Sequence, residues 1–183
     1  MTFTETAIAG AYIIDAQPFS DDRGWFMRTY CKAEFAQIGH TEEWVQMNHS
    51  FTKEPGSVRG MHFQYPPCAE IKMVRCIAGK VYDVIVDLRE GSPSFLKWAG
   101  VELSAENRQS LYIPKGVAHG FQVLQENSEL LYNHSSAYEP QSEGAILYND
   151  TMVGIVWPLP VSNISNKDLG YKPLDKNFKG IKI

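Results

Sequence analysis

The chain has 183 residues, of which 44% are hydrophobic and 21% charged, and a net charge of −4. This composition is typical of a folded globular protein, and the acidic balance disfavours nucleic acid or an anionic membrane surface as a partner. We find no linker, repeat, signal peptide, membrane-spanning run or Cys-x-x-Cys pair, so we expect one cytoplasmic domain over residues 1–183, without a disulfide framework.

In chain order, residues 32–38 are the best helix candidate, which Gly39 would end. Residues 71–77 favour a strand, and a Gly79-Lys80 turn separates it from residues 81–89, where more and less apolar positions alternate with period two. Further short strands are expected at residues 98–103, 109–113, 121–124 and 130–134, and a short turn after Ser165. This pattern predicts an all-β, jelly-roll type of barrel with a few short helices.

Residues 58–72 place Arg59, His62 and Lys72 around a Pro66-Pro67 turn in an apolar, strand-like context. A base, an ammonium and an anion-binding guanidinium this close together are what enolisation of a carbonyl compound requires. The alternative is that His62 is a hydrogen-bonded core histidine and the two cations lie at the rim. The segment is therefore the first candidate for a catalytic site.

Strand parity predicts which of these side chains share a cavity. His62 lies on one face of its strand and Lys72 on one face of the next strand, and these two faces could line the same cavity. Arg59 has the wrong parity to join His62 unless the strand carries a bulge or a twist between them, which Gly60 would permit. On residues 130–134, Tyr132 points the same way as its alternate neighbours and could reach the same cavity. The alternative for Tyr132 is an ordinary half-buried strand tyrosine.

Motifs along nearly the whole chain resemble those of the dTDP-4-dehydrorhamnose 3,5-epimerase family, a group of cupin-fold enzymes acting on nucleotide-linked 4-keto-6-deoxyhexoses. The resemblance rests on their order and spacing rather than on any one of them. The segments that carry it are Asp22-Arg23-Gly24-x-Phe26, Val45-Gln46-x-Asn48-His49-Ser50, Arg59-Gly60-x-His62-x-Gln64, Pro66-Pro67, Lys72, Ile113-Pro114-x-Gly116-x-Ala118-His119-Gly120-Phe121, Tyr132, Tyr138 and Ser165-x-Lys167-Asp168.

The resemblance implies four catalytic roles. No cofactor is expected, since the sequence has no Gly-rich dinucleotide loop or P-loop lysine motif, and no metal is expected, since no ligand set is complete. His62 is similar to the family's base, and Asp168 to the carboxylate that orients it. Lys72 corresponds to the ammonium that stabilises the enolate oxygen, and Tyr132 to the acid on the opposite face of the sugar ring. A base on one face and an acid on the other is what inversion of a carbon centre requires.

The resemblance also implies how the nucleotide sugar and a second subunit bind. Gln46, Asn48 and Arg59 match positions that hold the diphosphate and sugar, and His119 is expected to support the cavity. Arg23 and Phe26 resemble a segment that reaches across a twofold homodimer into the neighbouring subunit's site. The full set of substrate-binding candidates is Arg23, Phe26, Arg28, Gln46, Asn48, Arg59, His119, Tyr138 and Lys167.

Arg28 departs from the family pattern, in which Glu commonly stands at this position and can contact the base. A guanidinium only donates hydrogen bonds, so the contact must differ, unless Arg28 lies at a solvated rim or binds the diphosphate. Asn133 and residues 163–165 are further departures. The predicted activity is inversion at C3, C5 or both of a dTDP-4-dehydro-6-deoxyglucose type of sugar in deoxysugar biosynthesis, and the alternative is inversion of one centre on a CDP-linked 4-keto sugar.

Two other classes of protein remain as rivals. A metal-dependent cupin oxygenase or isomerase would use histidines such as His62, His119 and His134, but residue 64 is Gln where a His-x-His pair needs histidine. Lys72 would also place a cation beside the metal. A sugar-binding cupin without activity would be expected to have lost at least one of the four catalytic residues, and all four are present.

Overall fold

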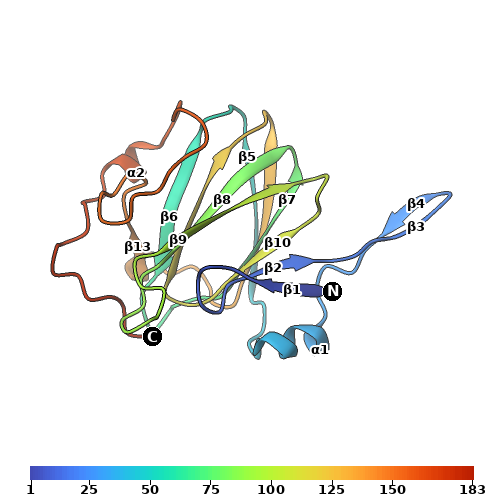
Figure 1. Ribbon diagram of the computed structural model, residues 1–183, viewed down its shortest axis with the longest axis horizontal. Coiled ribbons are helices and arrows are strands. Elements are labelled where there is room, and N and C mark those ends of the chain that lie inside the picture. The colour runs from blue at the N-terminus through green and yellow to red at the C-terminus, as the bar shows by residue number, and fades with distance from the viewer.

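Two antiparallel sheets face each other in the computed structural model, which describes all residues 1–183 (Figure 1). The six-stranded sheet has the order β1 (Thr2–Glu5), β2 (Tyr12–Asp15), β10 (Ser110–Ile113), β7 (Lys72–Ala78), β12 (Ser128–His134) and β5 (Gln46–Thr52). The five-stranded sheet has the order β13 (Glu143–Ala145), β6 (Val58–Gln64), β11 (Val117–Val123), β8 (Lys80–Asp87) and β9 (Trp98–Ser104). This arrangement is the cupin-type jelly roll that the sequence predicts.

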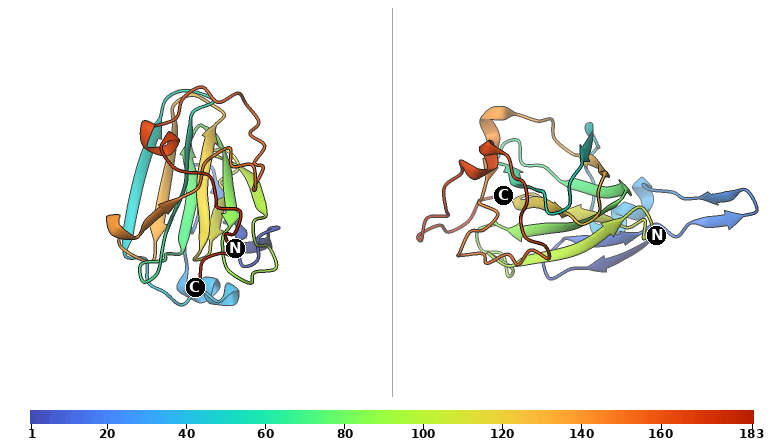
Figure 2. Two further views of the ribbon diagram at one scale, coloured as in Figure 1. Left: turned by 90° about the vertical axis from the view of Figure 1, so that its left-hand side faces the viewer. Right: turned by 90° about the horizontal axis from the view of Figure 1, so that it is seen from above.

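The largest hydrophobic cluster lies between the sheets and is built from alternate residues of their inner faces. Val74 and Leu130 contribute from the six-stranded sheet, and Ile85 and Phe121 from the five-stranded one. A second cluster covers the outer face of the five-stranded sheet, where the C-terminal part of the chain packs on it (Figure 2). The five-stranded sheet is therefore buried on both faces, which holds its strands in a fixed register.

Strand β8 shows the predicted alternation, but both of its faces are buried. Val84 and Val86 face the outer cluster, and Ile85 faces the core between the sheets. Asp83 and Asp87 are also fully buried, because each carboxylate accepts hydrogen bonds from neighbouring side chains. The more polar face of this strand thus points into the barrel rather than to solvent.

The two predicted helical segments are present. Helix α1 (Lys32–Phe35) continues as the 3₁₀ turn η1 (Ala36–Ile38), and Gly39 ends it in the left-handed conformation with φ of 77°. The predicted turn near Ser165 is α2 (Asn166–Leu169), whose first turn is capped by the Ser165 hydroxyl accepting from the N–H of Asp168 at 3.0 Å. A short 3₁₀ turn, η2 (Pro140–Ser142), precedes β13.

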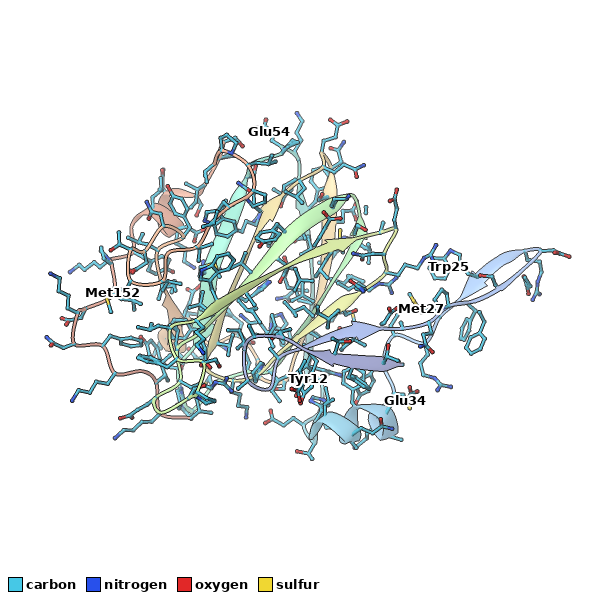
Figure 3. The ribbon with its side chains drawn as sticks, viewed as in Figure 1. Tyr12, Trp25, Met27, Glu34, Glu54 and Met152 are labelled. Carbon is cyan, nitrogen blue, oxygen red and sulfur yellow. The ribbon has the colours of Figure 1, made fainter.

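A hairpin of β3 (Phe19–Asp21) and β4 (Gly24–Phe26) projects from the body of the molecule (Figures 1 and 2). Figure 3 shows Trp25 on this hairpin and Met27 near its base. Phe19 and Phe26 are 76% and 72% exposed. Two large apolar side chains on a projecting hairpin are unusual for a surface that faces only water.

Strand β6 carries the predicted bulge at Gly60. Its partner β11 pairs His119 with His62 and Phe121 with Arg59, so two residues of β6 oppose one of β11. The bulge changes the parity of the strand, and both Arg59 and His62 line the same cavity. No helix of the structure has the length and apolarity needed to cross a membrane.

We expect Gly60→Ala to destabilise the fold and displace the two site residues that flank it. Gly60 has φ of 121°, and an added Cβ would lie 2.5 Å from Cα of Gly120 and 2.8 Å from the carbonyl oxygen of His119. The strain and clash should cost about 2–3 kcal/mol in urea unfolding. Gly24→Ala is the matched control, because Gly24 has φ of 133° with no atom within 4 Å of the added Cβ. An equal decrease in the free energy of unfolding of both variants would contradict the view that close contact with β11 makes Gly60 necessary.

Candidate active site

A cavity of about 390 Å³ opens between the sheets, which is large enough for a small-molecule ligand. Its polar lining includes His62, Asp168, Lys72 and Tyr132, the four predicted catalytic residues. His62 lies on β6 of the five-stranded sheet, whereas Lys72 and Tyr132 lie on β7 and β12 of the six-stranded sheet. The jelly roll thus brings side chains from opposite sheets to one cavity.

His62 and Asp168 form a closely hydrogen-bonded pair. His62 Nε2 lies 2.7 Å from Oδ1 of Asp168, which is almost fully buried. Burial alone would raise the pKa of Asp168, but the hydrogen bond and charge of His62 outweigh it, so the pKa lies below its ordinary value. An ionised Asp168 accepts the Nε2 proton, which leaves the lone pair of the neutral imidazole on Nδ1.

The lowered pKa of Asp168 has a consequence for stability. A carboxyl group whose pKa is lower in the folded state stabilises the protein at pH values above its unfolded-state pKa, and this contribution is lost as pH falls through the folded-state value. We therefore expect Asp168→Asn to lower the free energy of unfolding at neutral pH, and the difference from wild type to shrink below about pH 4. Urea unfolding between pH 3 and 7 measures both curves. A difference that stays constant over this range would contradict the expectation.

Lys72 is a buried ammonium with a buried counter-ion. Its Nζ lies 3.0 Å from Oε1 of Glu70 and 3.4 Å from the carbonyl oxygen of His62. The Lys72 and Glu70 side chains are 9% and 7% exposed. An ammonium has three N–H donors, so this geometry leaves one for an oxygen atom of a ligand in the cavity.

Tyr132 reaches the cavity from β12 and is held by Ser50 on β5, with the two hydroxyl oxygens 2.9 Å apart. Burial raises the pKa of Tyr132 well above its ordinary value. The phenol therefore keeps its proton at neutral pH and can act as an acid. Beside it, His119 lines the cavity and pairs with the buried Asp83 at 2.9 Å, with its ring centroid 6.1 Å from that of Tyr132.

Arg59 lines the cavity, and two nitrogens of its guanidinium donate hydrogen bonds to neighbouring protein groups. Its Nε donates to the Thr52 hydroxyl at 3.0 Å, and an Nη donates to the carbonyl oxygen of Phe51 at 3.3 Å. The remaining N–H donors can bind an anion, for which a planar, permanently charged group is well suited.

A smaller neighbouring pocket contains Gln46 and Tyr138, and shares Asn48 with the main cavity. Lys167 lines the main cavity and pairs with Glu143 at 2.7 Å, and Glu143 also accepts from the Tyr138 hydroxyl at 3.1 Å. The structure thus places the predicted residues Gln46, Asn48, Tyr138 and Lys167 in two pockets that share part of their lining.

The hairpin residues and Arg28 do not join this cavity within one chain. Arg23 pairs with Asp21 on the exposed hairpin, which forms a separate hollow of its own with Phe26. Arg28 pairs with Glu34 of α1 at 2.9 Å and is 61% exposed. A role for these three residues in ligand binding thus requires another subunit or a movement of the hairpin.

Several residues of the site were given no role from the sequence. Ser50 and Ser165 stand in the motifs, but only the structure shows that Ser50 bonds the Tyr132 hydroxyl and that Ser165 caps the helix that carries Asp168. Tyr171 packs edge-on against His62, with ring centroids 6.3 Å apart. Strand parity already places Glu70 on the same face as Lys72, but no role was assigned to it from the sequence.

The three histidines considered as metal ligands each have a carboxylate partner of their own. His62 pairs with Asp168, His119 with Asp83, and His134 with Glu70, the last with Nδ1 at 2.8 Å from the carboxylate. No group of three or more His, Cys, Asp or Glu side chains converges as a metal-binding cluster would. Their geometry is that of separate hydrogen-bonded pairs.

The chain matches proteins of one kind over nearly its whole length. The family model described as dTDP-4-dehydrorhamnose 3,5-epimerase matches residues 5–176. The dTDP-4-dehydrorhamnose 3,5-epimerase of Salmonella typhimurium is 44% identical over 96% of this chain and 97% of its own. Among solved structures, the same enzyme from Elizabethkingia anophelis superimposes with a TM-score of 0.93, at 38% identity over 97% of this chain and 98% of its own.

A more distant solved structure differs in its reaction. It is a 3'-monoepimerase from Streptomyces bikiniensis in complex with dTDP-quinovose, with a TM-score of 0.85 and 30% identity over 92% of this chain and 85% of its own. The family model and the relatives agree with the motifs and with the cavity that those motifs form. The chain belongs to the dTDP-4-dehydrorhamnose 3,5-epimerase family.

Proposed function

We propose that the protein is an isomerase that inverts C3 and C5 of a dTDP-linked 4-keto-6-deoxyhexose in deoxysugar biosynthesis, without a cofactor. Membership of the epimerase family supports this activity. The mechanism is supported by the fact that His62 and Tyr132 come from opposite sheets. His62 enters the cavity from one sheet and Tyr132 from the other, so a flat sugar ring between them can lose a proton on one face and gain one on the other.

The reaction begins at a carbon next to the C4 ketone. Nδ1 of His62 takes the proton from this carbon, while Asp168 orients the ring and stabilises the imidazolium that forms. The electron pair moves into the ketone, and Lys72 stabilises the resulting enolate oxygen with its remaining N–H donor. Tyr132 then gives its proton to the opposite face of the carbon, which completes one inversion and regenerates the ketone.

The diphosphate is assigned to Arg59, with Gln46 and Asn48 beside it at the mouth of the cavity. A forked cation at the mouth explains how a chain with a net charge of −4 can attract a doubly anionic ligand. Tyr138 and Lys167 lie on the same rim and are proposed to contact the sugar or its nucleotide. Lys167 would have to exchange part of its bond to Glu143 for that contact.

We also propose that the active form is a homodimer in which the β3–β4 hairpin completes the site of the neighbouring subunit. Arg23 at the turn of the hairpin and the exposed Phe26 at the end of β4 would supply a cation and a stacking surface for the nucleotide. Arg23→Ala combined with Phe26→Ala should then weaken dTDP binding while the mass measured by light scattering stays that of a dimer. A monomeric wild type would contradict the proposal.

Arg28 is the residue on which the choice between a thymidine-linked and a cytidine-linked substrate can be tested. Its pairing with Glu34 supports a role outside base recognition, and so favours a thymidine-linked substrate over a cytidine-linked one. We expect Arg28→Glu to leave dTDP first in rank among dTDP, CDP, UDP and GDP as competitive inhibitors. A change of rank order would instead support a CDP-linked sugar, because a site that reads one base separates nucleotides by about 1–3 kcal/mol per unpaired group.

The direct test is to incubate the protein with dTDP-4-keto-6-deoxyglucose in deuterium oxide and to follow the C3 and C5 protons by NMR, with and without chelator. We expect exchange at both carbons and no loss of rate with chelator, since Lys72 carries the enolate charge. Exchange at one carbon would restrict the activity to a single centre, as in the monoepimerase. Loss of activity with chelator, restored by a divalent ion, would favour a metal-dependent cupin.

A further inference from the structure

A chain of hydrogen bonds leads from the backbone N–H of Tyr138 to Lys72 through the side chains of Gln46, Asn48, His134 and Glu70. The N–H of Tyr138 fixes the direction of each bond in this chain. The N–H of Tyr138 can only donate, and its partner at 3.0 Å is Oε1 of Gln46. The other end of that side chain, Nε2, must therefore donate, and Oδ1 of Asn48 accepts it at 3.1 Å. Nδ2 of Asn48 is then a donor as well, and it faces Nε2 of His134 at 3.2 Å.

The same logic sets the protonation of His134 and of the carboxylate beyond it. Because Nε2 of His134 accepts from Asn48, its proton lies on Nδ1, which faces Oε2 of Glu70 at 2.8 Å. Oε1 of Glu70 receives Nζ of Lys72 at 3.0 Å. Both oxygens of Glu70 thus accept, which requires the ionised carboxylate.

The pKa of Glu70 also favours the ionised carboxylate. Burial alone would raise the pKa of Glu70, but the hydrogen bond from His134 and the charge of Lys72 outweigh it, and the pKa is lowered. A buried ammonium without a counter-ion would be costly, and one whose counter-ion could rotate freely would not stay aimed at the cavity. His134 prevents that rotation by holding the second oxygen.

We propose that Glu70, locked by His134, is the positioning residue that keeps the Lys72 ammonium charged and aimed at the enolate oxygen. The inference rests on the proposed function and extends it. The residues of the chain that fix the direction, Gln46 and Asn48, are those proposed to lie beside the diphosphate. Correct seating of the nucleotide and correct placement of the ammonium therefore depend on the same hydrogen bonds.

Other charged or titratable groups line the same pockets, but none forms a side-chain bond to Nζ of Lys72, and His62 contacts it only through its carbonyl oxygen. These groups are His62, Asp168, Arg59, His119, Tyr132 and Lys167 in the main cavity, and Tyr138 and Glu143 in the smaller pocket that Lys72 also lines. Glu70 is thus the one carboxylate that pairs with Lys72, and it is the residue to change.

The test is Glu70→Gln, which keeps the shape of the side chain and removes its charge. We expect kcat to fall about 100-fold, as for loss of one preorganised charge in an active site, while the Kd for dTDP stays within about threefold. The alkaline limb of the kcat/KM profile should move to lower pH, because the ammonium form of Lys72 loses its counter-charge. A residue with only a structural role would lower stability without moving this limb.

Matched variants separate positioning from folding. Glu102→Gln removes the carboxylate of another Lys–Glu pair, with Lys80 at 3.0 Å on the outside of β8 and β9, and should leave the pH profile unchanged. His134→Asn keeps a donor near the Nδ1 position and should retain activity within about fivefold, whereas His134→Leu should resemble Glu70→Gln. Equal losses of activity in His134→Asn and His134→Leu would show that the hydrogen bond from His134 does not hold Glu70 in place.

A spectroscopic readout is independent of turnover. In ¹⁵N NMR of the imidazole nitrogens, we expect His134 as the neutral Nδ1–H tautomer, and the Nε2–H tautomer would overturn the hydrogen-bond order. Wild-type protein that exchanges no proton of any 4-keto sugar would refute the proposed function itself. Wild-type exchange together with an unshifted alkaline limb in Glu70→Gln would refute only the role of Glu70.

Discussion

His62→Ala is expected to abolish deuterium exchange at both C3 and C5 of the sugar, with a loss of at least about 10³-fold in kcat/KM. The same imidazole serves both carbons, so no position should be spared. The Lys72 ammonium and the Arg59 guanidinium remain in the cavity, and dTDP should therefore still bind. Solvent exchange followed by NMR gives the rates, and calorimetry gives the dTDP affinity.

Two controls guard this experiment. His62→Gln retains an N–H donor for the buried Asp168, and should lose activity as completely as the alanine variant while unfolding less readily. His49→Ala removes a histidine that also pairs with a carboxylate, Glu129 at 2.7 Å, but lies outside the cavity, and it should remain active. Residual exchange at one carbon in His62→Gln would mean that a second base serves that carbon.

Tyr132→Phe is expected to separate proton abstraction from inversion. The base is intact in this variant, so substrate protons should still wash out into deuterium oxide. The acid on the other face is missing, and the yield of inverted product should fall by about 10²–10³-fold. NMR of the recovered sugar reports the two quantities in one sample.

Tyr112→Phe is the matched control, because Tyr112 is also a buried tyrosine with a hydrogen-bonded hydroxyl, 3.2 Å from Nδ1 of His40, in a different cluster. It should leave both exchange and inversion unchanged. If Tyr132→Phe lowers exchange and inversion to the same extent, the assignment of base and acid to the two residues is wrong.

Local sequence patterns predicted the elements whose signals are local. Gly39 ends the helix at residue 38 because the chain there needs a left-handed residue. The parity of Arg59 and His62 required a bulge or a twist at Gly60 if both were to line one cavity, and the structure has the bulge. The period-two pattern located β8 but did not say where its more polar face points, because burial of Asp83 depends on His119 of another strand.

Pairings between distant segments were not visible in local patterns. His62 and Asp168 are 106 positions apart, and the family resemblance alone joined them before the structure did. Strand β5 was missed because its residues are polar and mostly exposed at the edge of a sheet, which removes the alternation. The prediction for β11 began too late, at residue 121 instead of Val117, because Ala118 to Gly120 offer little hydrophobic signal although the whole strand is buried.

The pairing of Glu70 with both Lys72 and His134 shows what the structure adds to the motifs. Lys72 was recognised from a motif as a cation for the enolate, but the motif does not say what keeps it charged in a buried place. The hydrogen-bond chain that begins at the N–H of Tyr138 supplies that reason. Residues that act through another residue have weak sequence signals, because many residue types could do the same from a different position.

The central claim is that His62 removes a proton from one face of the sugar ring and that Tyr132 adds a different proton to the opposite face. It is tested most directly by converting unlabelled dTDP-4-keto-6-deoxyglucose in deuterium oxide and analysing the inverted product by mass spectrometry and NMR in the first turnover. We predict that each inverted carbon carries deuterium from solvent, because Tyr132 exchanges its proton with water before it reacts. Inverted product that retains the original hydrogen at C3 or C5 would contradict the account.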